Sequence, residues 1–366
     1  MNSLLHAEME QIHDELADRE RRSYQRFLVA ARGFWVNDMF AALRNHVAVE
    51  VQVSDAAQLG REEFERQVGK LPTYQLFAWF ERHLQRMRYA GSRGLVAGVE
   101  ARRSQLIAKL AQPLPYGLLE LDPDIEQPDY YTACDIHQHP GGVGADMLSA
   151  YVYRDAVHGG VVGKSTLHER FAKQIATRCS PSRVLDLGCG FGRSSYALAV
   201  AFPDARVHGV DLSASCVAVA AHETPEALRP RMKFTQADAL SSKLQGNQYD
   251  LVTSTMLLHE MPEDRVRALI AQTGRLLAAG GVVAHLDFLP PSDPLLRFVY
   301  EGHAARNNEP YLLEHSRIDL ASVYKAAGFC SVEVHDFAED DHALEDPPRG
   351  WRLPWKIIFA VKERVL

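Results

Sequence analysis

The sequence has few cysteines, no long apolar run and no excess of basic residues. Its five cysteines among 366 residues are scattered, odd in number and never in C-x-x-C spacing, which argues against a disulfide framework or a thiolate zinc site. No stretch approaches the roughly 20 consecutive apolar residues that a membrane-spanning helix needs. The formal net charge of −7 argues against a general nucleic-acid binder, which needs a basic field to displace counterions from phosphate.

The first residues are amphipathic and strongly charged, without the basic start, apolar middle and small-residue cleavage site of an export signal. We therefore expect a cytoplasmic protein that has neither a membrane nor a nucleic acid as a partner. An apolar content of 46% with 24% charged residues is typical of a soluble globular chain, and the length favours two domains.

Residues 1–125 are predicted to form helices, beginning with apolar residues at helical spacing between Leu4 and Leu16. This region carries no chemical motif and is interpreted as a cap or a dimerisation module. A turn-rich bridge and lid segment follows over 126–164. A helix predicted over 145–178 is expected to break near Gly159–Gly160.

The pattern changes at Val184 to short apolar runs that alternate with helices, which is typical of a parallel sheet covered on both faces. Helices are predicted near 192–202, 214–222, 263–278 and 317–327. Strands are predicted at 183–187, 206–210, 232–236, 250–254, 281–287, 330–336 and 355–362.

The first of these strands ends in the stretch VLDLGCGFGRSS, which has glycines at 188, 190 and 192. At the carboxyl end of a strand in an open α/β sheet, a ligand approaches the backbone closely, and a side chain would block it. The helix that begins near Gly192 points its free N–H groups at the same place. The alternative is a tight strand-to-helix turn without a ligand.

Two acidic residues support a nucleoside ligand. Asp211 ends the second strand, where a carboxylate can accept both hydroxyls of a ribose. Asp238 follows the third strand within reach of an adenine amino group, and Ala239 offers a backbone N–H; the alternative for Asp238 is a turn cap. The spacing G-x-G-x-G after Asp186 differs from the G-x-G-x-x-G of nicotinamide and flavin enzymes, and a ligand with an amino-acid tail fits it better.

At these residues the chain resembles the class I S-adenosylmethionine-dependent methyltransferases of the bacterial small-molecule type, over about 165–366. The segments that carry the resemblance are VLDLGCGFGRSS, VHGVDLS, QADAL, YDLVTSTMLLHEM and LLAAGGVVAHLDF. The resemblance implies an α/β, Rossmann-like seven-stranded sheet of order 3-2-1-4-5-7-6 with the last strand antiparallel, here preceded by a helical domain. It also implies S-adenosylmethionine as the cofactor, with S-adenosylhomocysteine as its product.

The roles that the resemblance implies fall on particular residues of this chain. Asp186 and the backbone of Gly188, Gly190 and Gly192 would hold the methionine end. Asp211 would hold the ribose and Asp238 the adenine. The remaining expected cofactor-binding residues are Leu212, Ala239 and Thr255.

Methyl transfer needs an acceptor pocket above the cofactor, and two segments are candidates to build it. The bridge is rich in tyrosine and histidine, and the connection after the fifth strand, 289–316, is longer than usual and is expected to be a lid. The predicted acceptor-contacting residues are Tyr131, His137, His139, Tyr153, Tyr300 and Asn308.

His259 is the first candidate for a general base, because it follows the fourth strand and imidazole titrates near neutrality. The alternative is that His259 packs in the turn before the next helix. The other catalytic candidates are Glu260, Asp287, Glu301 and His303. A metal site at His137 and His139 is considered and not predicted, because no third ligand has diagnostic spacing.

The sequence therefore predicts a cytoplasmic biosynthetic enzyme that moves a methyl group to an O, N or C atom of a small, partly apolar metabolite. Homodimerisation through the helical region is expected. The rival hypotheses are a nucleic-acid or protein methyltransferase, a nicotinamide dehydrogenase, and a non-catalytic S-adenosylmethionine-binding scaffold.

Overall fold

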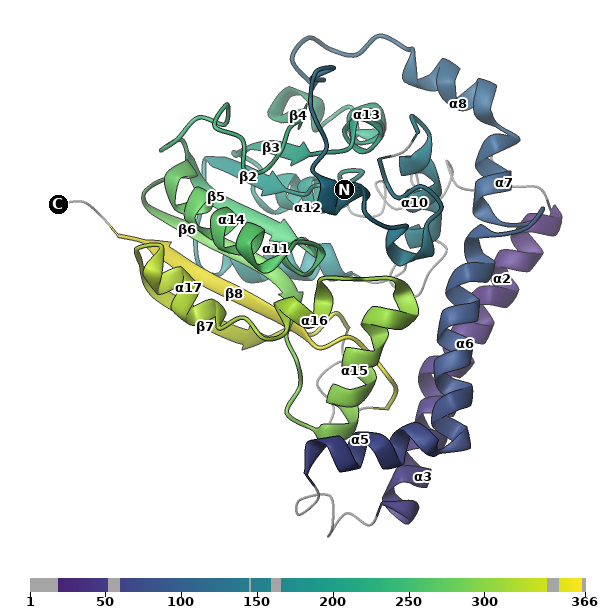
Figure 1. Cartoon of the computed structure of the whole chain (residues 1–366). Coiled ribbons are helices and arrows are strands. Elements are labelled where there is room, and N and C mark those ends of the chain that lie inside the picture. Colours follow the sequence, from purple (N-terminus) through teal and green to yellow (C-terminus); the bar gives the residue numbers. More distant parts are fainter. Residues whose placement is uncertain (1–18, 52–59, 145, 159–165, 341–348, 364–366) are drawn as a thin grey trace.

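The computed structural model describes residues 19–51, 60–144, 146–158, 166–340 and 349–363. An eight-stranded sheet of order β1-β4-β3-β2-β5-β6-β8-β7 forms its centre (Figure 1). Strand β8 is antiparallel to both of its neighbours. The strands are β1 (Leu119–Glu120), β2 (Arg183–Leu187), β3 (Arg206–Asp211), β4 (Met232–Gln236), β5 (Tyr249–Thr255), β6 (Leu277–Phe288), β7 (Phe329–Asp336) and β8 (Trp355–Lys362).

Seven of these strands, β2 to β8, lie in the predicted order, with the last strand inserted antiparallel between β6 and β7. The prediction of seven strands is corrected by β1, which comes from the region expected to be wholly helical. β1 pairs in parallel with β4, and the N–H of Phe234 donates to the carbonyl of Leu118 at 2.8 Å. The extra strand satisfies backbone groups that the edge strand β4 would otherwise leave unpaired.

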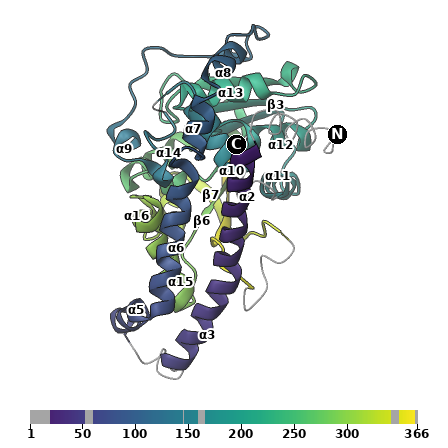
Figure 2. The same ribbon diagram turned by 90° about the vertical axis from the view of Figure 1, so that its right-hand side faces the viewer.

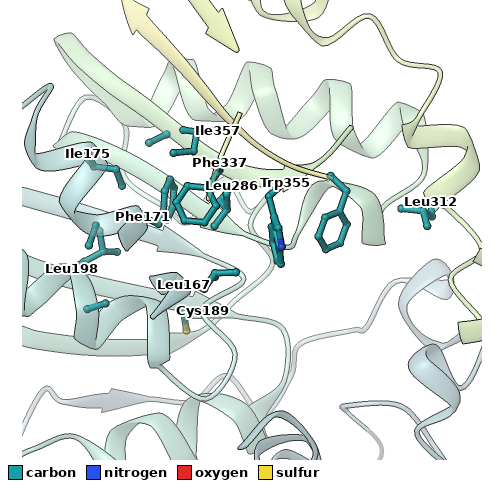
Figure 3. Packing of buried hydrophobic residues seen from close by; sticks show 14 of the residues in the cluster. Leu167, Phe171, Ile175, Cys189, Leu198, Leu286, Leu312, Phe337, Trp355 and Ile357 are labelled. Atoms are coloured by element: carbon teal, nitrogen blue, oxygen red, sulfur yellow. The ribbon is translucent and has the colours of Figure 1, made fainter. Parts of the chain in front are cut away.

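Helices cover both faces of the sheet, because strands such as β2 have successive buried residues that point to both faces. One face carries α11 (Leu167–Ala176), α12 (Arg193–Ala201) and α13 (Ala214–Glu223), and the other carries α14 (Glu263–Leu276) (Figure 2). Helix α17 (Leu320–Ala326) packs beside α14 and strand β7. Between α11, α12 and the sheet, Phe171, Ile175 and Leu198 lie near Leu286 and Ile357 (Figure 3).

The N-terminal region is helical, as predicted, although its first eighteen residues lie outside the described part. Helix α2 (Arg19–Phe34) continues through a π-helical turn, Trp35–Met39, into α3 (Phe40–Glu50). α2 and α6 lie side by side in both views (Figures 1 and 2). The later helices are α5 (Arg61–Lys70), α6 (Pro72–Tyr89), α7 (Leu95–Glu100) and α8 (Arg103–Leu110).

The helices of this region share their core with the α/β part of the chain. The ring of Phe40, which is fully buried, lies 6.2 Å from Phe77 of α6 and 6.1 Å from Trp351, which precedes β8. Leu28 and Phe77 belong to the same buried cluster as Phe171 of α11.

The connection after β6, expected to be a long loop, is largely helical. Helix α15 (Pro294–Asn307) begins with Asp293, whose carboxylate accepts the N–H of Leu296 at 2.8 Å, and α16 (Leu312–His315) follows. A proline at the first helical position and an acidic cap start this helix, a signal that the loop interpretation overlooked. α15 packs against α6 between the N-terminal helices and the sheet (Figure 1).

The bridge contains α9 (Asp129–Thr132), a 3-10 turn at Ile136–Gln138, and α10 (Ser149–His158). The helix predicted over 145–178 appears as α10 and α11. Its expected break at Gly159–Gly160 lies outside the described residues.

Candidate active site

A cavity opens at the carboxyl ends of β2 to β5, where the topology gathers the loops that follow these strands. Many of the predicted cofactor-binding residues line it together. These are Gly188, Gly190, Asp211, Leu212, Asp238, Ala239 and Thr255.

The glycine loop has the backbone that only glycine adopts without strain. Gly188, Gly190 and Gly192 have φ angles of +65°, +52° and +95°. A Cβ at Gly188 would meet the side chain of Leu257 at 2.9 Å, and one at Gly192 would meet Tyr196 at 2.7 Å. Gly192 starts α12 but does not line the cavity.

Asp211 is held in place by two backbone donors, the N–H groups of Gly190 and Ser213, each at 2.9 Å. Burial raises the pKa of this carboxyl above its ordinary value. Asp238 accepts the N–H of Leu240 at 2.8 Å, so it is a turn cap and a cavity residue at once. Oγ1 of Thr255 is buried and has no hydrogen-bond partner among the described residues.

Asp186 lies beneath the glycine loop and is not on the cavity wall. Its Oδ2 accepts the hydroxyls of Ser194 and Ser195, both at 2.6 Å, while its Oδ1 has no partner among the described residues. Burial raises the pKa of Asp186 to about 6, against the two hydroxyl donors, which lower it. The side chain therefore braces the start of α12 under the glycine loop.

The bridge also contributes residues to the cavity wall. Tyr131, His137 and Tyr153, all predicted to contact the acceptor, line it. His139 does not: it is 2% exposed, stacks on Tyr89 at 5.2 Å, and burial lowers its pKa to about 4.

Glu260 lines the cavity, but His259, the first candidate for the base, lies behind it. Nδ1 of His259 is 2.6 Å from Oδ1 of Asp287, and both side chains are buried. Asp287 also accepts the N–H groups of Leu258 and Phe288, each at 2.8 Å. This pair ties the turn after β5 to the end of β6.

The protonation of this pair follows from its contacts. Burial lowers the pKa of His259, but Asp287 and Glu260 raise it by more, so it lies well above its ordinary value. Burial raises the pKa of Asp287, and His259 lowers it by more, to about 2. His259 is thus an imidazolium without a free nitrogen for an acceptor.

The four predicted residues of the connection 289–316 also lie away from the cavity wall. Glu301 pairs with Arg61 and Arg297, His303 pairs with Glu81 and Glu309, Tyr300 is buried, and Nδ2 of Asn308 donates to the carbonyl of Asp135 at 2.8 Å.

Tyr130 and Tyr311, which belong to the two segments expected to build the acceptor pocket, also line the cavity. The structure adds Cys134 to the cavity wall and Glu81 behind it, neither of which the sequence singled out. Glu81 is buried on α6, seven residues before Arg88. It lies four residues after Phe77 and three before Leu84, which are both buried, and this helical spacing is the sequence signal that could have identified it as an inward-facing residue.

The described residues contain no cluster of three or more His, Cys, Asp or Glu side chains arranged to hold a metal ion. Among them there is also no helix long and apolar enough to cross a membrane.

Comparison with known proteins agrees with this geometry. Residues 184–281 match a family described as a methyltransferase domain. An uncharacterized methyltransferase of Synechocystis is 30% identical over 186 residues, which cover 49% of this chain and 80% of that protein. A demethylmenaquinone methyltransferase of Staphylococcus aureus is 27% identical over 188 residues, covering 46% and 76%.

Among solved structures, phosphoethanolamine N-methyltransferase 2 of Haemonchus contortus, in complex with phosphomonomethylethanolamine and S-adenosylhomocysteine, is 18% identical with a TM-score of 0.46. The match covers 66% of this chain and 62% of that one.

The sheet order and the cavity of glycines and acids define a nucleoside-binding protein of the doubly wound α/β class. The chain belongs to the class I S-adenosylmethionine-dependent methyltransferases. It is an enzyme, and S-adenosylmethionine is its cofactor.

Proposed function

We propose that this enzyme transfers the methyl group of S-adenosylmethionine to an oxygen or nitrogen atom of a small, partly apolar acceptor, and that Glu260 accepts the proton which the acceptor loses. The observation that carries the proposal is that one cavity is lined by seven of the nine predicted cofactor residues, by Glu260 and by tyrosines of the bridge. A carbon acceptor would use the same carboxylate to stabilise a developing positive charge.

The residues present fit the cofactor. Gly188 and Gly190 present backbone without side chains on the cavity wall, and the free Oγ1 of Thr255 and the acids Asp211 and Asp238 offer polar partners for a nucleoside. When bound, S-adenosylmethionine supplies a methyl group on a positively charged sulfur, which keeps the electron pair of the broken carbon–sulfur bond. The chain contributes alignment, exclusion of water and removal of a proton.

Glu260 is suited to take that proton. Oε1 lies 3.0 Å from Nε2 of His137 and 3.4 Å from Nε2 of His259, and Oε2 is buried without a hydrogen-bond partner among the described residues. Burial raises the pKa of Glu260, but His137 and His259 lower it by more, so the group is an ionised carboxylate with one oxygen free. As the lone pair of the acceptor atom forms the bond to the methyl carbon, the proton on that atom passes to Oε2 of Glu260.

Four tyrosines favour an acceptor that is partly apolar, because their rings present apolar faces with a polar tip. They are Tyr130, Tyr131, Tyr153 and Tyr311.

The test is a panel of small phenols, alcohols and amines, with formation of S-adenosylhomocysteine as the readout. Glu260→Gln should lower kcat on a turned-over acceptor by about 10²- to 10⁴-fold and leave the affinity for S-adenosylhomocysteine nearly unchanged. Glu333→Gln is the matched control, because this exposed carboxylate also pairs with a histidine, His335, but on the edge strand β7. Turnover by Glu260→Gln at the wild-type rate would remove Glu260 from the mechanism.

We also propose a homodimer through the N-terminal helices. Large apolar side chains exposed by more than half on α2 and α6 support it: Phe27 at 57%, Phe34 at 51%, Leu76 at 51% and Trp79 at 53%. A monomeric mass in light scattering at micromolar concentration would contradict the dimer. The net charge of −7 supports the proposal that the enzyme does not act on nucleic acid, and weak retention on heparin would agree with that.

A further inference from the structure

Three buried or partly buried histidines each lie between two carboxylates, and the groups form one continuous chain. The chain starts on α6, passes through α15 and the bridge, and reaches the turn after β5. Glu81 contacts Nδ1 of His303, and Nε2 of His303 lies 3.3 Å from Glu309. Glu309 lies 3.1 Å from Nδ1 of His137, and Nε2 of His137 lies 3.0 Å from Glu260. Glu260 lies 3.4 Å from Nε2 of His259, and Nδ1 of His259 lies 2.6 Å from Asp287.

Charges alternate along this chain. Burial lowers the pKa of His137 and of His303, but their neighbouring carboxylates raise both by more, His303 to about 9. Burial raises the pKa of Glu309, and His303 and His137 lower it by more, to well below its ordinary value. Each imidazolium therefore stabilises the ionised form of the carboxylates beside it.

Glu309 occupies the middle of the chain. Its side chain is 3% exposed and its Oε1 contacts both His137 and His303, whereas His137 is 28% exposed and Glu260 is 20% exposed. His137 also has a strained backbone, with φ at +53°, and its carbonyl accepts Nε2 of Gln85 on α6 at 2.9 Å. Glu309 contacts Nδ1 of this ring, and Glu260 contacts its Nε2.

The far end is anchored in the N-terminal helices. Glu81 accepts from Nε of Arg306, and its Oε1 accepts Nδ2 of Asn307 at 3.0 Å, in addition to its contact with His303. Arg306 also donates to the carbonyl of Val299 at 2.7 Å. The carboxylate of α6 is thus locked onto α15, the helix that carries His303.

We propose that Glu309 is a positioning residue of methyl transfer: it holds His137 against Glu260 so that Oε2 of Glu260 is free for the acceptor, and Glu81 holds Glu309 in turn through His303. The proposal rests on the proposed function of Glu260. Through Glu81, helix α6 thus helps to orient the carboxylate of Glu260, although α6 itself does not line the cavity.

The test is the pH dependence of kcat for Glu309→Gln. Without this carboxylate the pKa of His137 falls, so its positive charge is less complete and it lowers the pKa of Glu260 by less. The acid limb of the kcat profile should therefore move to higher pH by about one unit. At pH values below this limb, the variant should have about tenfold lower kcat than the wild type. The other titratable groups that face Glu260 are His259, Tyr131 and Cys134 of the bridge, and Tyr153 of α10, and the variant leaves all four in place.

Further variants separate positioning from folding. Glu309→Asp should restore part of the wild-type profile, and Glu309→Gln added to Glu260→Gln should cause no further loss, because both act on one group. If Glu309→Gln lacks a cooperative thermal transition, His137→Gln makes the same test at a more exposed position. Glu333→Gln should keep the wild-type profile.

Two results would overturn the inference while the proposed function stands: an unshifted limb in a folded Glu309→Gln enzyme, or additive losses in the double variant. Activity lost to a chelator and restored by a divalent cation would mean that Glu260 is a metal ligand, which would overturn both the inference and the proton-accepting role of Glu260. A wild-type enzyme that binds S-adenosylhomocysteine but turns over no acceptor would overturn both proposals.

Discussion

Asp211 is the residue on which cofactor binding is expected to depend most. Its two oxygens are already oriented by the N–H groups of Gly190 and Ser213, so the carboxylate is in place before a ligand arrives. Asp211→Ala should weaken the binding of S-adenosylhomocysteine by roughly 1.5–3 kcal/mol, the cost of losing hydrogen bonds to a charged group. Isothermal titration calorimetry measures this.

The control for this variant is Asp204→Ala, an exposed acid in the turn before the same strand. It should leave the affinity unchanged. Equal affinity of Asp211→Ala and the wild type would show that Asp211 does not contact the ribose.

His259 is expected to matter for stability more than for turnover, because it is buried against Asp287 behind the cavity wall. His259→Ala leaves a buried carboxylate without its ion-pair partner, which should lower the free energy of unfolding by about 3–5 kcal/mol. Urea denaturation followed by circular dichroism measures the loss.

His335→Ala is the comparison, because it breaks an exposed His–Glu pair and should cost at most about 1 kcal/mol. If His259→Ala instead keeps its stability and loses turnover by about 10²- to 10⁴-fold, the original hypothesis of a histidine base would be supported and our interpretation of the pair would be wrong.

At the scale of elements, the N-terminal helices and the α/β part are joined by shared apolar packing. Phe40 is fully buried at the start of α3 and contacts Phe77 of α6 and Trp351 next to β8. Phe40→Ala should lower the free energy of unfolding by about 3–5 kcal/mol and leave a single cooperative transition, because the cavity it creates lies where these elements meet.

Tyr116→Ala removes a fully exposed ring of similar size and should change stability by less than about 0.5 kcal/mol. Two separate transitions, with the helical signal lost first, would show that the N-terminal helices form an independent unit. The division into residues 1–125, 126–164 and 165–366 remains a prediction that this experiment addresses.

For the whole molecule, the histidines predict a stability maximum near pH 6.5. The pKa of His303 is raised to about 9, so the stability it contributes is present below the unfolded value of about 6.5 and is lost as the pH rises through 9. His137 and His259, with pKa values raised well above the ordinary one, act in the same direction.

On the acid side other buried histidines act in the opposite direction. Burial lowers the pKa of His168 to about 3 and that of His285 to about 4, so the unfolded chain binds more protons below pH 6.5 and stability falls there. Melting temperatures measured between pH 4 and 9 should therefore decline on both sides of the maximum. His303→Gln should flatten the alkaline decline; an equally steep decline would contradict its assignment.

The sequence alone determined the sheet, because the alternation of apolar strands and helices after Val184 is a local pattern with a small number of stable arrangements. It also identified the residues at the strand ends, such as Gly190, Asp211 and Asp238, since parallel strands bring their carboxyl ends to one edge. It missed β1 and α15: a two-residue strand has no periodicity of its own, and Pro294 was interpreted as part of a loop.

Only the tertiary structure decided which of the candidate acids and histidines meet the cavity. His259 and Glu260 are adjacent in the chain, yet one faces Asp287 in the core and the other faces the cavity. The partner of His303 lies on α6, more than two hundred residues earlier. Such pairings depend on how helices pack across the sheet, and local sequence carries no signal for contacts over that separation.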